Sequence, residues 1–225
     1  RRQRQMCIRD SYTNGRPPLE LGGVLYCDRE TVDKIEKMKV CTCLNPLHTA
    51  LAVFACLLGY TLISKEMDNP VLKKLVEVIG YEEGLPVVVN PGVIDPKKFI
   101  DEVVNIRIPN PFMPDTPQRI ATDTSQKLGI RFGETIKAYA ASPELNVSDI
   151  KLIPLVFAGW LRYLMAIDDN GNEFTLSPDP MLDEVRPYVA DIKLGDSFDA
   201  DAKLKDILSN AKIFGVNLYE AGLAE

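Results

Sequence analysis

Apolar residues are densest between Thr49 and Leu62, where charged side chains are absent. A helix that is apolar on all sides belongs in a protein core. Asn45 and Pro46 precede this run, and both are typical of a helix start, because Asn can cap an unpaired backbone N–H and proline fits the first helical position. The pattern therefore predicts a buried helix from Pro46 to about Leu62, with Asn45 as a candidate cap.

Helical spacing and helix-start signals recur along the rest of the chain. Residues 28–38 place Val32, Ile35 and Met38 on one side of a helix. The run 87–90 is predicted to be an extended connector rather than a strand, and a turn, with at most a two-stranded ribbon, is expected at 168–176. The whole pattern predicts a mainly α, single-domain protein. Further helices are expected at 71–79, 96–106, 117–128, 132–141, 148–167, 180–190 and 200–209, with stops at Gly80 and Gly129.

Composition narrows the class of protein. The chain has 225 residues, 46% of them hydrophobic, and a net charge of −6. The negative charge argues against a nucleic-acid binder and gives no attraction to anionic membranes. The apolar run at 50–63 is too short for a confident membrane span. Five cysteines without framework spacing favour a reducing compartment, so we expect a cytoplasmic protein.

Residues 1–11 differ from the sequence that follows. They contain four arginines and one aspartate and carry a charge of +3. We interpret them as a foreign or disordered tail and exclude them from the fold. A basic arm that binds a partner is the alternative. The remaining chain divides into a connecting segment at 12–27 and a helical domain at 28–225.

Three polar residues stand at the start of the apolar helix: Lys39, Asn45 and His48, the only histidine of the chain. Taken singly, each has a structural interpretation, as a solvated charge, a helix cap and a core residue. Taken together they suggest catalysis. A lysine near apolar walls and other cations can accept a proton near neutral pH, and an amide with an imidazole can hold a developing alkoxide.

Arg119 and Lys127 form a second candidate set. An arginine fork and a lysine point charge suit an anion or a polyol, although an ordinary exposed helix face is the simpler interpretation. On one continuous helix the eight intervening steps correspond to roughly 12 Å, so only the long side chains could converge.

Other kinds of site find little support. Cys41 and Cys43 lack the further ligands that zinc needs, so no metal site is predicted. The acidic and amide residues at 168–172 lack the rest of a calcium loop and are better read as a turn. The sequence contains neither Gly-x-Gly-x-x-Gly nor a phosphate-binding P-loop.

From Thr13 onward, a series of motifs in order resembles the C-terminal domain of the mannitol dehydrogenase family. These are long-chain polyol and hexuronate dehydrogenases, among them fructuronate and tagaturonate reductases; the motifs are most similar to those of the hexuronate branch, to which the fructuronate reductases belong. The motifs are Asn-Gly-Arg-Pro-Pro at 14–18, Glu-Lys-Met-Lys at 36–39, Leu-Asn-Pro-Leu-His-Thr-Ala-Leu at 44–51, Asn-Pro at 110–111, Asp115, Arg-Ile-Ala-x-Asp-x-Ser-x-Lys at 119–127 and Phe-Gly-Val at 214–216.

The resemblance implies an NAD(P)-dependent oxidoreductase without metal, acting on a sugar acid or polyol. The implied fold is the multi-helix C-terminal domain of the mannitol dehydrogenase and 6-phosphogluconate dehydrogenase type. The family's general acid/base falls on Lys39, its substrate-orienting pair on Asn45 and His48, and its substrate-binding pair on Arg119 and Lys127. In the family the lysine stands five residues before the asparagine, whereas Lys39 stands six before Asn45. Either a one-residue bulge lies at 41–43, or Lys39 is not the proton carrier and Lys37 is a weaker substitute.

The resemblance also implies that a nucleotide-binding domain is missing from this sequence. Residues 12–27 would then be the linker from it, and most of the NAD or NADP contacts would be made by it, so the cofactor-binding residues are unknown and the fragment alone is expected to be inactive. Within the family, mannitol 2-dehydrogenase and tagaturonate reductase are alternatives. From a different class, a non-catalytic helical interaction domain is the competing hypothesis.

Overall fold

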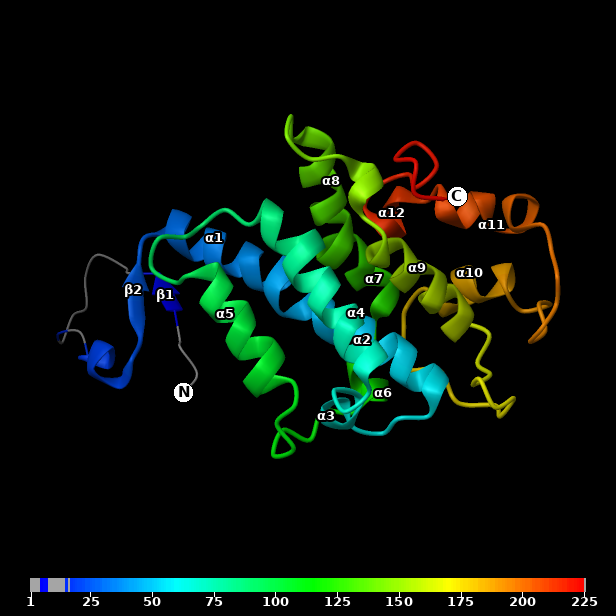
Figure 1. The fold of residues 1–225 in the computed structure, drawn as a ribbon, viewed down its shortest axis with the longest axis horizontal. Coiled ribbons are helices and arrows are strands. Elements are labelled where there is room, and N and C mark those ends of the chain that lie inside the picture. Colours follow the sequence, from blue (N-terminus) through cyan, green and yellow to red (C-terminus); the bar gives the residue numbers. More distant parts are fainter. Residues whose placement is uncertain (1–4, 8–14, 16, 225) are drawn as a thin grey trace.

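The computed structural model describes residues 5–7, 15 and 17–224, and it confirms a mainly α fold. Figure 1 shows the helices gathered along a long central helix formed by α1 and α2, with the strands at one end and α10, α11 and α12 at the other. The α-helices are α1 (Arg29–Met38), α2 (Asn45–Leu58), α3 (Ile63–Glu66), α4 (Pro70–Glu77), α5 (Pro96–Glu102), α6 (Pro117–Ile120), α7 (Thr124–Leu128), α8 (Glu134–Ala141), α9 (Leu152–Tyr163), α10 (Leu182–Val185), α11 (Ala200–Leu208) and α12 (Ala211–Phe214).

The central helix begins where the sequence predicts. Asp28 caps α1 by accepting a hydrogen bond of 2.7 Å from the backbone N–H of Thr31, and the predicted apolar side of α1 is buried. Helical structure then continues for 30 residues, from Arg29 to Leu58, long and apolar enough to cross a membrane by length and composition alone. Because 72% of its most apolar window is buried inside the fold, it is better explained as a core helix. It ends at Gly59, whose φ of 76° closes the helix four residues earlier than predicted.

Four segments of π-helix interrupt or extend the α-helices, and the sequence pattern did not predict them. They are η2 (Lys39–Cys43), η3 (Val78–Gly84), η5 (Val103–Arg107) and η6 (Gly129–Gly133). A π-turn accommodates one extra residue, so the chain stays helical while the side chains that follow change direction. The predicted stops at Gly80 and Gly129 are therefore wrong. These glycines allow close packing: a Cβ on Gly80 would lie 2.7 Å from Ile100, and one on Gly129 3.0 Å from the backbone of Gly215.

Several predicted boundaries change in the second half of the chain. The helix expected at 117–128 is two helices, α6 and α7, because Asp123 adopts a φ of 54° between them. The expected ribbon near 170 is a single bridge between Ile167 and Glu173. No strand forms at 87–90, which agrees with the prediction for that run. Short 3₁₀ segments complete the described structure: η1 (Leu19–Gly22), η4 (Leu85–Val87), η7 (Val147–Asp149) and η8 (Arg186–Tyr188).

Strands β1 (Gln5–Cys7) and β2 (Leu25–Cys27) form a two-stranded parallel pair, with Met6 opposite Tyr26. The interpretation of residues 1–11 as a disordered tail is therefore wrong for 5–7, whose backbone pairs with β2. The rest of that stretch lies outside the described residues. The domain boundaries predicted at 12 and 28 stay predictions.

The core fixes α2 against α9. Gly159 on α9 has no side chain where a Cβ would meet the ring of Phe54 at 2.7 Å, so the two helices approach closely. Behind this contact, four aromatic rings pack edge to face or tilted, with centroids 4.9–5.9 Å apart: Phe132, Phe157, Trp160 and Phe214. This packing fixes the middle of α2, about two turns after His48.

Candidate functional site

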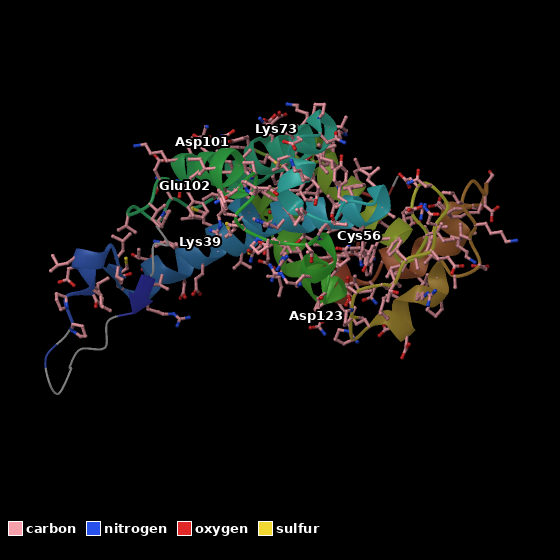
Figure 2. The ribbon with its side chains drawn as sticks, turned by 90° about the horizontal axis from the view of Figure 1, so that it is seen from below. Lys39, Cys56, Lys73, Asp101, Glu102 and Asp123 are labelled. Carbon is pink, nitrogen blue, oxygen red and sulfur yellow. The ribbon has the colours of Figure 1, made fainter. Side chains whose placement is uncertain are left out.

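Lys39 lies on the π-segment η2, directly before α2. Its ammonium group lies 5.5 Å from the centroid of the Phe99 ring, and Figure 2 shows Lys39 where the central helix passes α5. Burial lowers the pKa of Lys39, and the neighbouring Arg107 lowers it further, against the opposing effect of Glu36. A half-buried lysine in this environment releases its proton more easily than a solvated one, so a larger fraction of it is in the neutral form that can accept a proton.

The π-segment contains the extra residue that the spacing of Lys39 and Asn45 requires. Two hydroxyl groups satisfy backbone carbonyls of this turn: Thr42 donates to the carbonyl of Met38 at 2.6 Å, and Thr135 of α8 donates to the carbonyl of Cys41 at 3.1 Å. The turn is therefore a hydrogen-bonded part of the fold. Its one-residue insertion is the kind of bulge expected at 41–43, although the role of Lys39 itself stays a prediction.

His48 lies one turn into α2 and is partly buried. Its Nδ1 lies 3.0 Å from the carbonyl oxygen of Leu44. A carbonyl only accepts, so Nδ1 carries the hydrogen and, in the neutral ring, Nε2 keeps a free lone pair. Burial lowers the pKa of His48, with Arg107 and Arg131 adding to the effect, while the bond to Leu44 and the nearby Asp115 oppose it. The imidazole is therefore neutral at physiological pH.

Asn45 is not the cap of α2, contrary to the prediction. The helix already includes Asn45, its cap position is Leu44, and no side chain there caps the helix. The Asn45 backbone carbonyl accepts a hydrogen bond of 3.0 Å from the Thr49 hydroxyl. Its side-chain amide has no hydrogen-bond partner among the residues that the structure describes. The amide is thus available to a ligand beside His48.

Two arginines that sequence reasoning missed belong to the same region. Arg107, at the end of η5, acts electrostatically on both Lys39 and His48. Arg131, on η6, donates a short hydrogen bond to the Thr49 hydroxyl on α2 and acts on His48 as well. Burial lowers the pKa of Arg131 to about 10, so its guanidinium stays charged at neutral pH. No pattern marks Arg107; Arg131 could have been noted because it stands four residues after Lys127.

Arg119 and Lys127 lie on different helices, α6 and α7, so the estimate along one helix was wrong. Arg119 is 64% exposed and forms a short ion pair with Asp115. The Lys127 ammonium folds back and donates to the carbonyl oxygens of Ile120, at 3.2 Å, and Thr122. These are carbonyls near the break between α6 and α7. Burial and the positive charges of Arg131 and Arg119 lower the pKa of Lys127.

Electrostatic interactions link four of the five predicted residues, and the fifth, Asn45, stands three residues before His48 on α2. Arg107 connects Lys39 with His48, Arg131 connects His48 with Lys127, and Asp115 connects His48 with Arg119. Three cavities lie outside this region. One of about 270 Å³ lies beside α1, one of about 540 Å³ lies between α9 and α11, and one of about 440 Å³ lies beside the end of α8. Within the described part of the chain, no group of three His, Cys, Asp or Glu side chains could hold a metal ion. What this region offers is cations, an amide and a neutral imidazole.

Comparison with known proteins gives this arrangement a family. The model of the mannitol dehydrogenase C-terminal domain matches residues 31–225. A Thermotoga maritima protein named D-mannonate oxidoreductase is 62% identical over 222 residues, which cover 98% of this chain and 41% of that protein. Mannitol dehydrogenase 2 of Saccharomyces cerevisiae is 33% identical over 177 residues, 79% of this chain and 34% of the yeast protein.

A solved structure gives the same result for the fold. The Pseudomonas fluorescens mannitol 2-dehydrogenase ternary complex with NAD and D-mannitol has a TM-score of 0.77 and 27% identity, covering 97% of this chain and 41% of that one. The chain thus spans about two fifths of the length of the relatives that it matches most fully. With a family model over most of its length, a similar relative and a shared fold, the chain belongs to the mannitol dehydrogenase family, and it contains that family's C-terminal domain.

Proposed function

We propose that this chain is the helical substrate domain of an NAD(P)-dependent oxidoreductase that interconverts a keto sugar acid of the fructuronate type and the corresponding hydroxy acid. The observation that supports it most is the position of Lys39, Asn45 and His48 around the start of one buried helix, where the charge of Arg107 acts on both Lys39 and His48. The name of the Thermotoga relative, D-mannonate oxidoreductase, supports an acidic substrate.

The chemistry assigned to each residue follows from its environment. When the hydroxy acid is oxidised, Lys39 in its neutral form accepts the hydroxyl proton, which its lowered pKa favours. The Asn45 amide donates a hydrogen bond to the same oxygen and stabilises the negative charge that develops on it. His48 accepts through Nε2, because Nδ1 is engaged with Leu44, and thereby orients a substrate hydroxyl. In the reduction, the Lys39 ammonium returns the proton.

The nicotinamide cofactor, when bound, supplies or removes the hydride. The sequence contains no glycine-rich dinucleotide motif, so we propose that a preceding domain of the complete enzyme binds most of the cofactor. The residues on this chain fit the substrate side of such a site: the Asn45 amide has no partner among the described residues, and the Nε2 of His48 keeps its lone pair. A cytoplasmic location stays a prediction.

The experiment is an assay of the complete enzyme with NADH and NADPH against fructuronate, tagaturonate and fructose. We expect the highest kcat/KM with fructuronate. Preference for tagaturonate or fructose would move the protein to the tagaturonate reductase or mannitol 2-dehydrogenase branch. Absence of turnover with all three would contradict the proposal and favour the non-catalytic interaction domain.

A further inference from the structure

We propose that Arg107 and Arg131 bind the carboxylate of the sugar acid in front of His48, and thereby select acids over neutral polyols. This inference rests on the proposed function and identifies residues that neither the sequence motifs nor the family comparison assign. The chain carries a net charge of −6, yet this region collects several cations around one imidazole.

The two cations that the motifs single out are already engaged. Arg119 is paired with Asp115, and Lys127 donates to the carbonyl oxygens of Ile120 and Thr122. The charge of Arg119 is already compensated by a carboxylate, and Lys127 has one ammonium hydrogen left after donating to two carbonyls. Each therefore offers less to a substrate carboxylate than a guanidinium without an anionic partner.

Arg107 and Arg131 have no such anionic partner. Among the described residues, no carboxylate forms an ion pair with either guanidinium, and Arg107 makes no side-chain hydrogen bond. Among the described residues, Arg131 donates only to the Thr49 hydroxyl, a neutral group that leaves most of the guanidinium hydrogens unused. Both side chains are half-buried, so each charge is partly removed from water without compensation. An anionic ligand would supply it.

The local backbone supports a functional origin for this arrangement. Lys39, Arg107 and Arg131 each lie on a separate π-segment, η2, η5 and η6. An isolated π-turn is less stable than an α-turn and is found frequently at functional sites, where it redirects a side chain. Two of these turns, far apart in sequence, place Arg107 and Arg131 where their charges act on His48, and the third places Lys39 where the charge of Arg107 acts on it. General packing of helices does not require that coincidence.

A carboxylate is the anion that fits best. A planar guanidinium binds a carboxylate through two parallel hydrogen bonds, and Arg107 and Arg131 both act on the same imidazole. A phosphate of the cofactor is a second kind of anion that guanidinium groups bind. The two sources of the anion differ in which kinetic constant they control.

The test uses the complete enzyme with Arg107→Gln, Arg131→Gln and Arg131→Lys. Arg186→Gln, an exposed arginine on η8, is the matched control. We expect the KM for fructuronate and the Kd of mannonate to rise roughly 10- to 100-fold in the glutamine variants, as expected for loss of a charge-assisted pair. We expect kcat to change less than about threefold, since binding common to ground and transition state is lost, and the KM for NADH to stay constant. Arg131→Lys should recover part of the loss.

Three outcomes would overturn the inference. An unchanged KM for fructuronate in both glutamine variants would mean that neither arginine binds the acid. A raised KM for NADH instead would assign the anion to the cofactor. A lowered melting temperature with all constants altered would indicate a structural role for Arg131; Arg107→Gln then decides, since Arg107 makes no side-chain hydrogen bond to the described residues. If the unaltered enzyme turns over none of the three sugars, the proposed function fails first; if it turns over fructuronate, only this inference is at stake.

Discussion

The two ends of α2 treat buried polar groups differently. At its N-terminal end, Asn45 and His48 are only partly buried and lie near a set of cations. Near its C-terminal end, Cys56 lies beside Glu66 of α3, whose side chain is 0% exposed and whose two carboxylate oxygens have no partner among the described residues. Figure 2 shows Lys39 and Cys56 far apart along the central helix.

Burial changes pKa values at both ends, so a shifted pKa alone does not identify a site. Desolvation lowers the pKa of His48 and raises that of Glu66 to about 8, and each group is neutral at physiological pH. The difference lies in what surrounds them. His48 has a fixed hydrogen bond to Leu44 and neighbours with available charges, whereas no other charged group is seen to perturb Glu66. Convergence of several groups marks the functional end.

The largest effect expected is on Lys39. Replacing Lys39 by alanine in the complete enzyme should lower kcat by about 10²- to 10⁴-fold, because a positioned proton carrier contributes that much. Lys37→Ala is the matched control, since Lys37 is exposed and lines the 270 Å³ cavity beside α1. Steady-state kinetics with fructuronate and NADH check both variants. A loss confined to Lys37→Ala would transfer the role to Lys37 and end the assignment of Lys39.

At the other end, Glu66→Gln should change stability and leave turnover intact. The folded state keeps Glu66 protonated up to about pH 8, against an ordinary value of 4.5, so the unfolded chain releases that proton first as pH rises. Between these values the native protein therefore loses stability with pH, at up to about 1.4 kcal/mol per pH unit. The glutamine variant lacks this slope. We expect it to match the original protein near pH 5 and to exceed it by roughly 2 kcal/mol at pH 7.

Urea denaturation of the two chains at both pH values is the measurement. Glu144→Gln, at an exposed position, should follow the original protein at each pH. The prediction fails if the stability difference between Glu66→Gln and the original chain is no larger at pH 7 than at pH 5. That result would mean that the Glu66 carboxyl is already ionised in the folded protein.

The sequence predicts the start and the buried side of these helices better than the turns within them. The cap at Asp28, the apolar side of α1 and the buried nature of α2 followed from residue types and spacing. The π-turns did not, because one inserted residue changes helical periodicity too little to be seen in a short window. Arg107 was missed because no pattern marks it, and Arg131, which stands four residues after Lys127, was not recognised as part of the same set. Gly80 and Gly129 were predicted to end helices, but they allow close packing instead. Glycine serves both purposes, so the residue type alone does not distinguish them.

Gly133 tests whether the packing behind Arg131 holds the N-terminal end in place. A Cβ at Gly133 would lie 2.2 Å from the backbone carbonyl oxygen of Phe214, which cannot move as a flexible side chain could. Gly133→Ala should therefore destabilise the chain by about 1–3 kcal/mol and, by moving η6, raise the KM for fructuronate. Gly22→Ala, where no atom lies within 4 Å of the added Cβ, is the control for denaturation. Equal stability of the two variants would show that η6 shifts without strain.

The smallest effect is expected from Asp115→Asn, which removes the ion-pair partner of Arg119 and a carboxylate that acts on His48. Stability should change by less than about 0.5 kcal/mol, because the Arg119 side chain is 64% exposed and surface ion pairs contribute little. Relief of the repulsion between Asp115 and a bound carboxylate is worth about 0.5 kcal/mol for like charges separated by water, so the KM for fructuronate should fall about twofold. A larger fall, with kcat unchanged, would mean that the released Arg119 itself binds the acid. In that case Arg119, a residue of the sequence motif, would bind the ligand near the N-terminal end of α2. Arg107 and Arg131 would contribute only to the electrostatic potential around the ligand.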